Sequence, residues 1–172
     1  MPIARLIRSL PAAGLLALAP LAAHAAATPA SPPPIAAPAA AQAAMLTSAD
    51  PLLAANKRLV YDFWRVVIEA QNLDRAGDFL AEDYLQHNPN VPTGRAGFVT
   101  FFTPYAHAST PVAEIRGGLI SIFAERDLVV LAFAREMPGK TPADKPFTTT
   151  AFDMFRVKDG KIVEHWDGDV PR

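Results

Sequence analysis

The sequence predicts an α+β domain in which helices pack on one face of an antiparallel sheet. Apolar residues recur at three- and four-residue spacing between residues 50 and 102, which is typical of amphipathic helices. From residue 114 onward, short apolar runs are instead separated by turn residues, as in a series of strands. Helices followed by a meander of strands are typical of the α+β class.

The first helix is expected to begin at Asp50-Pro51 and to end near residue 71. Aspartate accepts hydrogen bonds from the free amides of a helix N-terminus, and proline suits the first helical position. One side of this segment carries apolar residues at helical spacing, which predicts a helix buried along that side. These residues are Leu52, Ala55, Leu59, Phe63, Val67 and Ala70.

Two shorter helices are expected to follow. The second spans about residues 74–86 and stops at the proline-containing run of residues 88–92, because proline disfavours helix in the residue before it. The third begins near Thr93, carries Phe98, Phe101 and Phe102, and ends before Pro104. The expected architecture therefore has three N-terminal helices.

About four strands are expected after the helices, at residues 114–124, 128–137, 147–157 and 161–167. Asp159-Gly160 between the last two predicts a two-residue type I′ hairpin. In an unbroken register, opposed residues share a face, so Phe155 would pair with Glu164 and Asp153 with Trp166. This register directs those four residues toward the helices and directs His165 and Asp167 outward, and a slip of one residue would reverse it.

The N-terminal residues differ in chemistry from the rest of the chain. Residues 1–25 have two arginines, a short uncharged apolar stretch and Ala23-His24-Ala25, which together predict a cleaved signal peptide. An uncleaved membrane anchor is the alternative, although the stretch is short and Pro11 and Pro20 interrupt it. Residues 26–49 are mostly Ala and Pro and predict a disordered tether. We therefore expect a folded domain at residues 50–172 of a periplasmic or secreted protein, with no stable membrane insertion after cleavage.

Composition excludes several classes of function. The formal net charge of −1 argues against a nucleic-acid partner, and the absence of cysteine excludes disulfides and thiolate chemistry. The histidines of the domain show no paired metal-ligand spacing, so we expect no metal. No phosphate-binding glycine loop or nucleophile elbow is present in the sequence. We therefore expect no cofactor.

Two stretches carry a family resemblance. Tyr84-Leu85-Gln86-His87-Asn88-Pro89, followed by Gly94-Arg95-Ala96-Gly97-Phe98, resembles SnoaL-like proteins of the NTF2-like superfamily, and so does the run from Phe152 to Asp167. The resemblance covers essentially residues 50–172. It implies a cone-shaped fold with an apolar pocket at its open end, and often a homodimer formed through the sheet. One departure is Leu131-Ala132-Phe133-Ala134, where many relatives carry histidine.

The resemblance implies acid/base chemistry without a cofactor but leaves the reaction open. Namesakes of the family close polyketide rings by aldol condensation, using a pocket carboxylate, and other relatives isomerise, dehydrate or only bind small molecules. We expect an exported protein whose pocket takes a small, apolar carbonyl compound and catalyses enolisation followed by aldol condensation, isomerisation or dehydration. The alternatives are a non-catalytic periplasmic binding module and a dimeric interaction module.

Asp153 is the expected catalytic base, because a carboxylate among aromatic side chains is partly desolvated and suits proton removal beside a carbonyl. A structural hydrogen bond to Trp166 or to a backbone amide is the alternative. His87 is the expected polar aid, since the family match directs it to the pocket, and a helix C-cap is the alternative. The expected pocket lining is aromatic and acidic, with His165 and Asp167 as lesser candidates. It consists of Phe63, Tyr84, Phe102, Phe155, Glu164 and Trp166.

Overall fold

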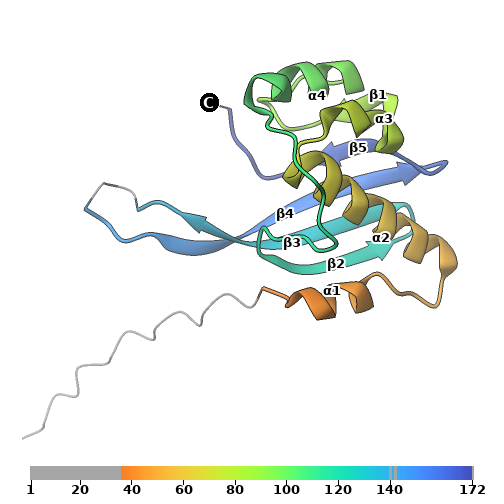
Figure 1. The fold of residues 1–172 in the computed structure, drawn as a ribbon, viewed down its shortest axis with the longest axis horizontal. Coiled ribbons are helices and arrows are strands. Elements are labelled where there is room, and N and C mark those ends of the chain that lie inside the picture. Colours follow the sequence, from red (N-terminus) through yellow and green to blue (C-terminus); the bar gives the residue numbers. More distant parts are fainter. Residues whose placement is uncertain (1–35, 140, 142, 172) are drawn as a thin grey trace, which may run out of the picture. The chain divides into compact units, whose positions relative to one another are not determined.

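The computed structural model describes residues 36–139, 141 and 143–171. In this part of the chain, helices lie against one face of a five-stranded sheet, so the predicted α+β class is confirmed (Figure 1). The strand order is β1-β5-β4-β3-β2, with β1 parallel to β5 and all other neighbours antiparallel. The strands are β1 (Leu80–Gln86), β2 (Leu119–Glu125), β3 (Leu128–Met137), β4 (Phe147–Lys158) and β5 (Lys161–Trp166).

The first predicted helix forms and changes its winding near its end. It comprises α2 (Pro51–Phe63), which continues as a π-helical segment, η1 (Trp64–Glu69). Asp50 caps it as predicted, because its Oδ1 accepts the amide of Leu52 at 2.8 Å. Wider π-helical turns recur at functional sites in proteins, and this one carries side chains that reach the cavity described below.

The second predicted helix is wrong over most of its length. A 3-10 turn, η2 (Leu73–Arg75), and one helical turn, α3 (Ala76–Phe79), lead directly into β1. Leu80 and Tyr84 are buried at a spacing of four, which fits one face of a helix and alternate positions of a strand equally well. Pairing with β5 decides the matter, because it provides the backbone hydrogen bonds that a helix would otherwise supply.

The third helix and the start of the first predicted strand also differ in detail from the expectation. Helix α4 (Arg95–Phe102) begins after Gly94, while the Thr93 hydroxyl accepts the amide of Gln86 at 2.9 Å. A further 3-10 turn, η3 (Thr103–Tyr105), follows α4. Strand β2 begins only at Leu119, because the amides of Arg116 and Gly117 donate to the Glu69 carboxylate rather than to a neighbouring strand.

The last hairpin contains a bulge that the sequence register missed. Asp159 and Gly160 both have positive φ, 50° and 71°, as a type I′ turn requires, and Val157 pairs with Ile162 as predicted. The register then shifts by one residue. From there on, Phe155 pairs with His165 rather than with Glu164. The predicted pairing of Asp153 with Trp166 is therefore wrong as well, and the facing of β5 beyond Val163 is inverted.

Part of the predicted disordered tether, residues 26–49, is ordered in the structure. Ala39–Met45 form helix α1, whose buried Gln42 donates to the carbonyl of Ile115 at 2.8 Å and accepts the Tyr61 hydroxyl at 2.6 Å. The ammonium of Lys57 donates to the carbonyl of Met45 at 2.6 Å. Composition cannot reveal this docking because it rests on a few polar side chains within an alanine-rich run.

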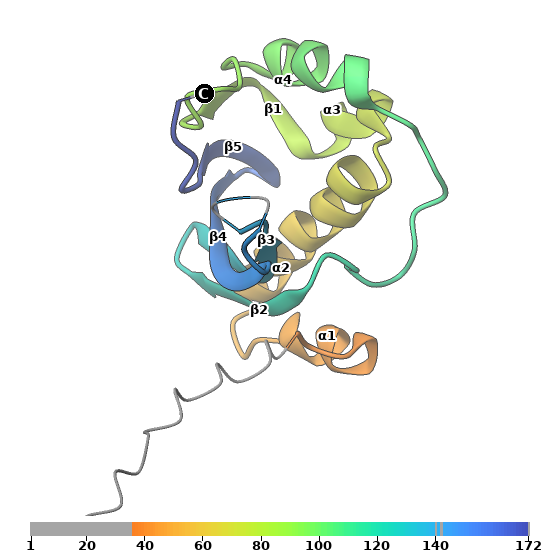
Figure 2. The same cartoon turned by 90° about the vertical axis from the view of Figure 1, so that its left-hand side faces the viewer.

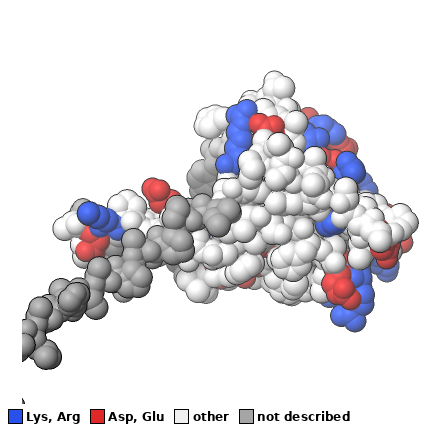
Figure 3. Space-filling model, turned by 90° about the horizontal axis from the view of Figure 1, so that it is seen from below, with Lys and Arg blue, Asp and Glu red and all other residues white. Residues whose placement is uncertain are grey.

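Charged side chains are sparse on the face seen from below, on the side of α1 and β2, as expected from the uncharged sequence of α1 (Figure 3). No helix in the described part of the chain has the length and apolarity needed to cross a membrane. The predicted signal peptide, residues 1–25, lies outside the described residues.

The core lies between α2 and the concave face of the sheet. The end of β3 and the start of β4 extend away from the other strands and form the β3–β4 arm (Figure 1). Seen along this arm, the strands form an arc beside α2 (Figure 2). Phe63 sits at the centre, with ring centroids of Phe79, Phe98 and Phe155 at 6.0, 6.0 and 5.9 Å. A cavity lies beside this aromatic cluster, next to the end of β1 and to Asp167.

Gly118 is the position where the fold most needs glycine. Its φ is +79°, and a Cβ atom there would lie 2.6 Å from the backbone oxygen of Ala134. We expect Gly118→Ala to lower the free energy of unfolding by at least about 1–3 kcal/mol. Gly168→Ala is the matched control, since no atom lies within 4 Å of its added Cβ. Urea denaturation of both variants checks this, and equal stability would contradict it.

Candidate active site

A cavity of about 140 Å³, the inner cavity, lies between the helices and the concave face of the sheet. One part of its wall is aromatic and aliphatic and comes from α2, η1, α4 and β4. Such a surface favours an apolar ligand. The apolar lining residues are Phe63, Trp64, Ile68, Val91, Phe98, Phe102 and Phe155.

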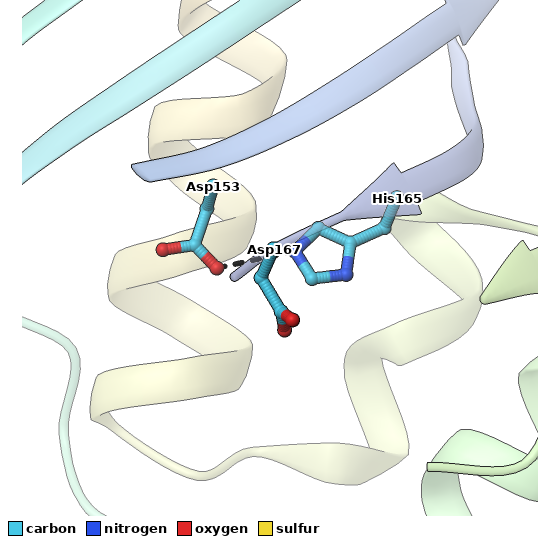
Figure 4. A group of neighbouring side chains, drawn as sticks. All are labelled: Asp153, His165 and Asp167. Carbon is cyan, nitrogen blue, oxygen red and sulfur yellow. Dashed lines mark hydrogen bonds and ion pairs between the residues drawn. The ribbon is translucent and has the colours of Figure 1, made fainter. Parts of the chain in front are cut away.

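The other part of the wall is polar and centres on three side chains. Asp153 comes from β4, His165 from β5 and Asp167 from the residues just after β5, and their side chains turn toward one another (Figure 4). His165 Nε2 lies 3.1 Å from Asp153 Oδ1. Asp153 and His165 are each only 7% exposed. A buried carboxylate and imidazole in contact form a unit that can hold or release a proton.

The amide of Gln86 fixes which ring nitrogen of His165 carries hydrogen. Gln86 Oε1 lies 2.9 Å from the backbone amide of Asn88, which can only donate, so this atom is an oxygen. The same oxygen lies 2.8 Å from His165 Nδ1, so Nδ1 must donate to it. Nε2 therefore faces Asp153 either as the acceptor of a carboxyl proton or as the donor of an imidazolium proton.

The end of β1 holds this polar wall together. Tyr84, Gln86 and Asn88 occupy alternate positions and face the cavity. The Asn88 side-chain amide donates to Asp167 at 2.6 Å, and the Gln86 side-chain amide donates to the Tyr84 hydroxyl at 3.0 Å. The parallel contact between β1 and β5 thus orients both His165 and Asp167.

Tyr84 is kept in its protonated form. Burial, with the Asp167 and Asp153 carboxylates nearby, raises the pKa of the Tyr84 phenol well above its usual value near 10. Its hydroxyl accepts a hydrogen bond from Gln86 and donates to no acceptor among the described residues. The phenol is therefore a neutral hydrogen-bond donor in the wall of the inner cavity.

A second, larger cavity of about 330 Å³, the outer cavity, lies against the concave face of the β3–β4 arm. Asp153 and Asp167 line both cavities. Arg135 is among the residues of the outer one. The two carboxylates therefore lie at the boundary between the inner and the outer cavity.

Most of the expected pocket residues reach the inner cavity. Five of the residues expected at the pocket line it, namely Asp153, Phe63, Tyr84, Phe102 and Phe155. His165 and Asp167 also line it, and the expectation that they point outward is wrong. The physical reason is the bulge in β5, which turns His165 to the concave side.

His87, Glu164 and Trp166 are not among the residues that line either cavity. His87 directly follows Gln86, so its side chain points to the opposite side of the chain. Its ring stacks on Trp166, with the two ring centroids 5.0 Å apart. Its Nε2 lies 2.8 Å from Glu164, which also accepts from Arg156 at 2.9 Å. These hydrogen bonds, with that from His87 the stronger cause, hold the pKa of the Glu164 carboxyl below its usual value.

Several cavity residues were absent from the sequence prediction. Tyr84, Gln86 and Asn88 follow one another at two-residue spacing, which puts all three side chains on one face of a strand. A helix was predicted for this segment, and two-residue spacing does not give a common face on a helix. Of the apolar ones, Trp64, Ile68 and Phe98 lie on η1 and α4, and Val91 lies in the loop before α4. The unpredicted lining residues are Trp64, Ile68, Gln86, Asn88, Val91 and Phe98.

The three polar residues also form a possible ligand set for a metal ion. One ligand atom each from Asp153, His165 and Asp167 lies within 4.8 Å of the others. The expectation that no metal binds rested on the spacing of ligands along the chain. Spacing along the sequence is no longer an argument against a metal, because β4 brings Asp153 beside His165 and Asp167 at the end of β5.

The sequence of the chain matches a known protein family. The sequence model of the family described as "SnoaL-like polyketide cyclase" matches residues 58–169. This range contains β1 to β5 and every residue that lines the inner cavity. A search of curated protein sequences finds no significant match.

Solved structures of low sequence identity also resemble the chain. An LEH-like epoxide hydrolase from M. tuberculosis is 15% identical, with a TM-score of 0.47 over 68% of this chain and 84% of that one. TsrD from Streptomyces laurentii is 21% identical, with a TM-score of 0.44 over 70% and 90%. An NTF2-like protein from Burkholderia pseudomallei is 17% identical, with a TM-score of 0.47 over 66% and 89%.

The buried phenol makes a prediction about alkaline stability. Because the folded-state pKa of Tyr84 is raised, its unfolded form releases a proton above about pH 10 while the folded form does not. Folding should lose stability there by up to roughly 1.4 kcal/mol per pH unit from this residue. The difference in unfolding free energy between the wild-type protein and Tyr84→Phe, measured from pH 8 to 11, isolates this effect. A difference independent of pH would refute it.

Proposed function

Because the chain belongs to the SnoaL-like polyketide cyclase family, we propose that it catalyses a cofactor-free acid/base reaction on a small carbonyl compound. The inner cavity of about 140 Å³ is below the usual range for drug-sized ligands, so the reacting part of the substrate is small. The outer cavity of about 330 Å³ beside it has room for a longer remainder of the substrate. The aromatic lining favours an apolar reacting part.

The observation that carries the proposal is the buried Asp153–His165 pair at the wall of an aromatic cavity. Asp153 removes a proton from the carbon beside the substrate carbonyl, and His165 shares that proton through Nε2. The resulting enolate adds to a second carbonyl in an aldol condensation, is reprotonated elsewhere in an isomerisation, or expels a leaving group in a dehydration. His165 takes the role that the sequence had suggested for His87.

Tyr84 supplies the complementary group in this proposal. Removal of the proton leaves negative charge on the substrate oxygen, and a neutral phenol in a buried site stabilises such charge by a hydrogen bond. The raised pKa of Tyr84 supports this role, because the phenol stays protonated at neutral pH. Base and oxyanion donor thus lie on the same polar wall.

We test the catalytic proposal with exchange of α-hydrogens for deuterium in a panel of small aryl ketones, followed by NMR. Asp153→Asn should lower the enzymatic exchange rate about 10²–10⁴-fold, because it removes the base. Glu164→Gln is the matched control, since that carboxylate lies outside the cavity, and its rate should equal that of the wild-type protein.

Tyr84→Phe should lower kcat about 10²–10³-fold, because it deletes the oxyanion donor without emptying the cavity. Unchanged exchange in Asp153→Asn would remove this residue from the mechanism. Binding of the ketones with no exchange by the wild-type protein would favour the non-catalytic binding module instead.

We further propose that the protein is exported and acts as a homodimer in the periplasm or outside the cell. Residues 1–25 support export through their charge and apolar pattern. The exposed apolar side chains of Leu85, Phe123 and Phe152, on three strands of the sheet, support association through the sheet.

Native mass spectrometry of the protein purified from the periplasm tests both statements together. We expect a dimer whose subunits begin after residue 25, and a co-purified small molecule would identify the ligand class. A monomer that retains residues 1–25 would contradict both. A dimer with an empty cavity that binds no ketone would favour the interaction module.

A further inference from the structure

We propose that Asp153, His165 and Asp167 bind one divalent transition-metal ion, of the Zn²⁺ or Mn²⁺ class, and that the bound ion blocks the acid/base reaction. The first statement rests on the geometry of the polar wall alone. The second rests on the proposed function, because it assumes that Asp153 and His165 carry the reaction.

The donor atoms converge from rigid elements. His165 and Asp167 are two residues apart and therefore lie on one side of the chain as it leaves β5, and Asp153 faces them from β4. His165 Nε2 and Asp153 Oδ1 are 3.1 Å apart, close to the separation of adjacent ligands around an ion bound at about 2.1 Å. Rotation of the Asp167 side chain closes the remaining distance, since all three ligand atoms lie within 4.8 Å.

The second ring nitrogen of His165 has a hydrogen-bond acceptor of the kind found beside metal-binding histidines. A ligating imidazole almost always donates its second N–H to an acceptor that fixes its orientation. Gln86 Oε1 accepts from Nδ1 at 2.8 Å and is itself fixed by the amide of Asn88. This contact lies outside the three-residue cluster, and it leaves the lone pair of Nε2, when that atom is unprotonated, aimed at the two carboxylates.

The local charge favours a cation. Asp153 and Asp167 form no ion pair with any Lys or Arg in the described part of the chain. Asp167 receives only uncharged donors, from the Asn88 side chain at 2.6 Å and from the backbone amide of Asp169 at 3.0 Å. Two neighbouring carboxylates with so little cationic compensation bind a positive ion more readily than each would alone.

The mixed donor set selects the class of ion. One imidazole nitrogen and two carboxylate oxygens suit Zn²⁺ and Mn²⁺, whereas Mg²⁺ prefers oxygen ligands and retains its waters. Asp153 and Asp167 also line the outer cavity of about 330 Å³, so an ion can reach them from either cavity. A bound ion would occupy the Nε2 lone pair and the Asp153 oxygen that the proton transfer needs.

The test uses the full chain purified without a polyhistidine tag and freed of metal. Isothermal titration calorimetry with ZnCl₂ and with MnCl₂ should show one ion bound per chain, and MgCl₂ should give no saturable binding. His165→Gln should abolish the binding. His87→Gln is the matched control, because His87 also contacts a carboxylate but lies outside the cluster, so this variant should bind as the wild-type protein does.

A second pair of variants tests the orienting contact and keeps the proposal independent of one substitution. Gln86→Met removes the acceptor for Nδ1 and should weaken the affinity about 10–100-fold. Gln86→Glu restores an oxygen acceptor and should retain the affinity of the wild-type protein. Far-UV circular dichroism of each variant verifies the fold, so that a loss of affinity can be assigned to the contact.

The outcomes for binding and for catalysis are distinguishable. Absence of saturable binding by the wild-type protein, or equal binding by His165→Gln, would overturn the metal site while leaving Asp153-dependent exchange intact. Stoichiometric binding without inhibition of exchange would overturn the second statement. Inhibition of exchange by Zn²⁺ that disappears in Gln86→Met at the same ion concentration would support both statements.

Discussion

One extra residue in β5 determines which side chains face the cavity. Val163 has no partner in the ladder between β4 and β5, so the residues before and after it obey opposite alternations. Ile162 packs in the core, and three positions later His165 is again on the concave side. Without that bulge, Glu164 and Trp166 would face the helices, and the imidazole would lie on the outer surface. The chemistry of the site therefore depends on a local irregularity of the backbone.

The parallel pairing of β1 with β5 turns this irregularity into an ordered site. Gln86 and Asn88 at the end of β1 contact His165 and Asp167 at the end of β5, and the two strands approach this edge from residues about eighty positions apart. Each amide side chain makes several hydrogen bonds at once, so the orientation of one fixes the orientation of the next. A network of this kind limits the rotamers of the acidic residues before any ligand arrives.

Sequence reasoning predicted the elements whose signals are local. Asp50 marked the start of α2, Asp159-Gly160 marked the hairpin, and β3 has the predicted bounds. It failed where the deciding interaction is distant: β1 is a strand only because β5 lies beside it, and α1 is ordered only through its docking contacts. The candidate base, Asp153, lies on the helix side of the sheet where the sequence register put it, because the extra residue is in β5 and not in β4.

The docking of α1 has a consequence for how the domain is delimited. The side chain of Gln42 accepts a hydrogen bond from the backbone amide of Ile115. The amides of Arg116 and Gly117, which follow Ile115, donate to Glu69 at the end of η1. Segment η1 also carries Trp64 and Ile68, which line the cavity. An alanine-rich stretch that contributes no side chain to the cavity is thus connected to its wall through two successive contacts. The boundary of the functional unit accordingly lies before residue 39, although the sequence model of the family begins matching only at residue 58.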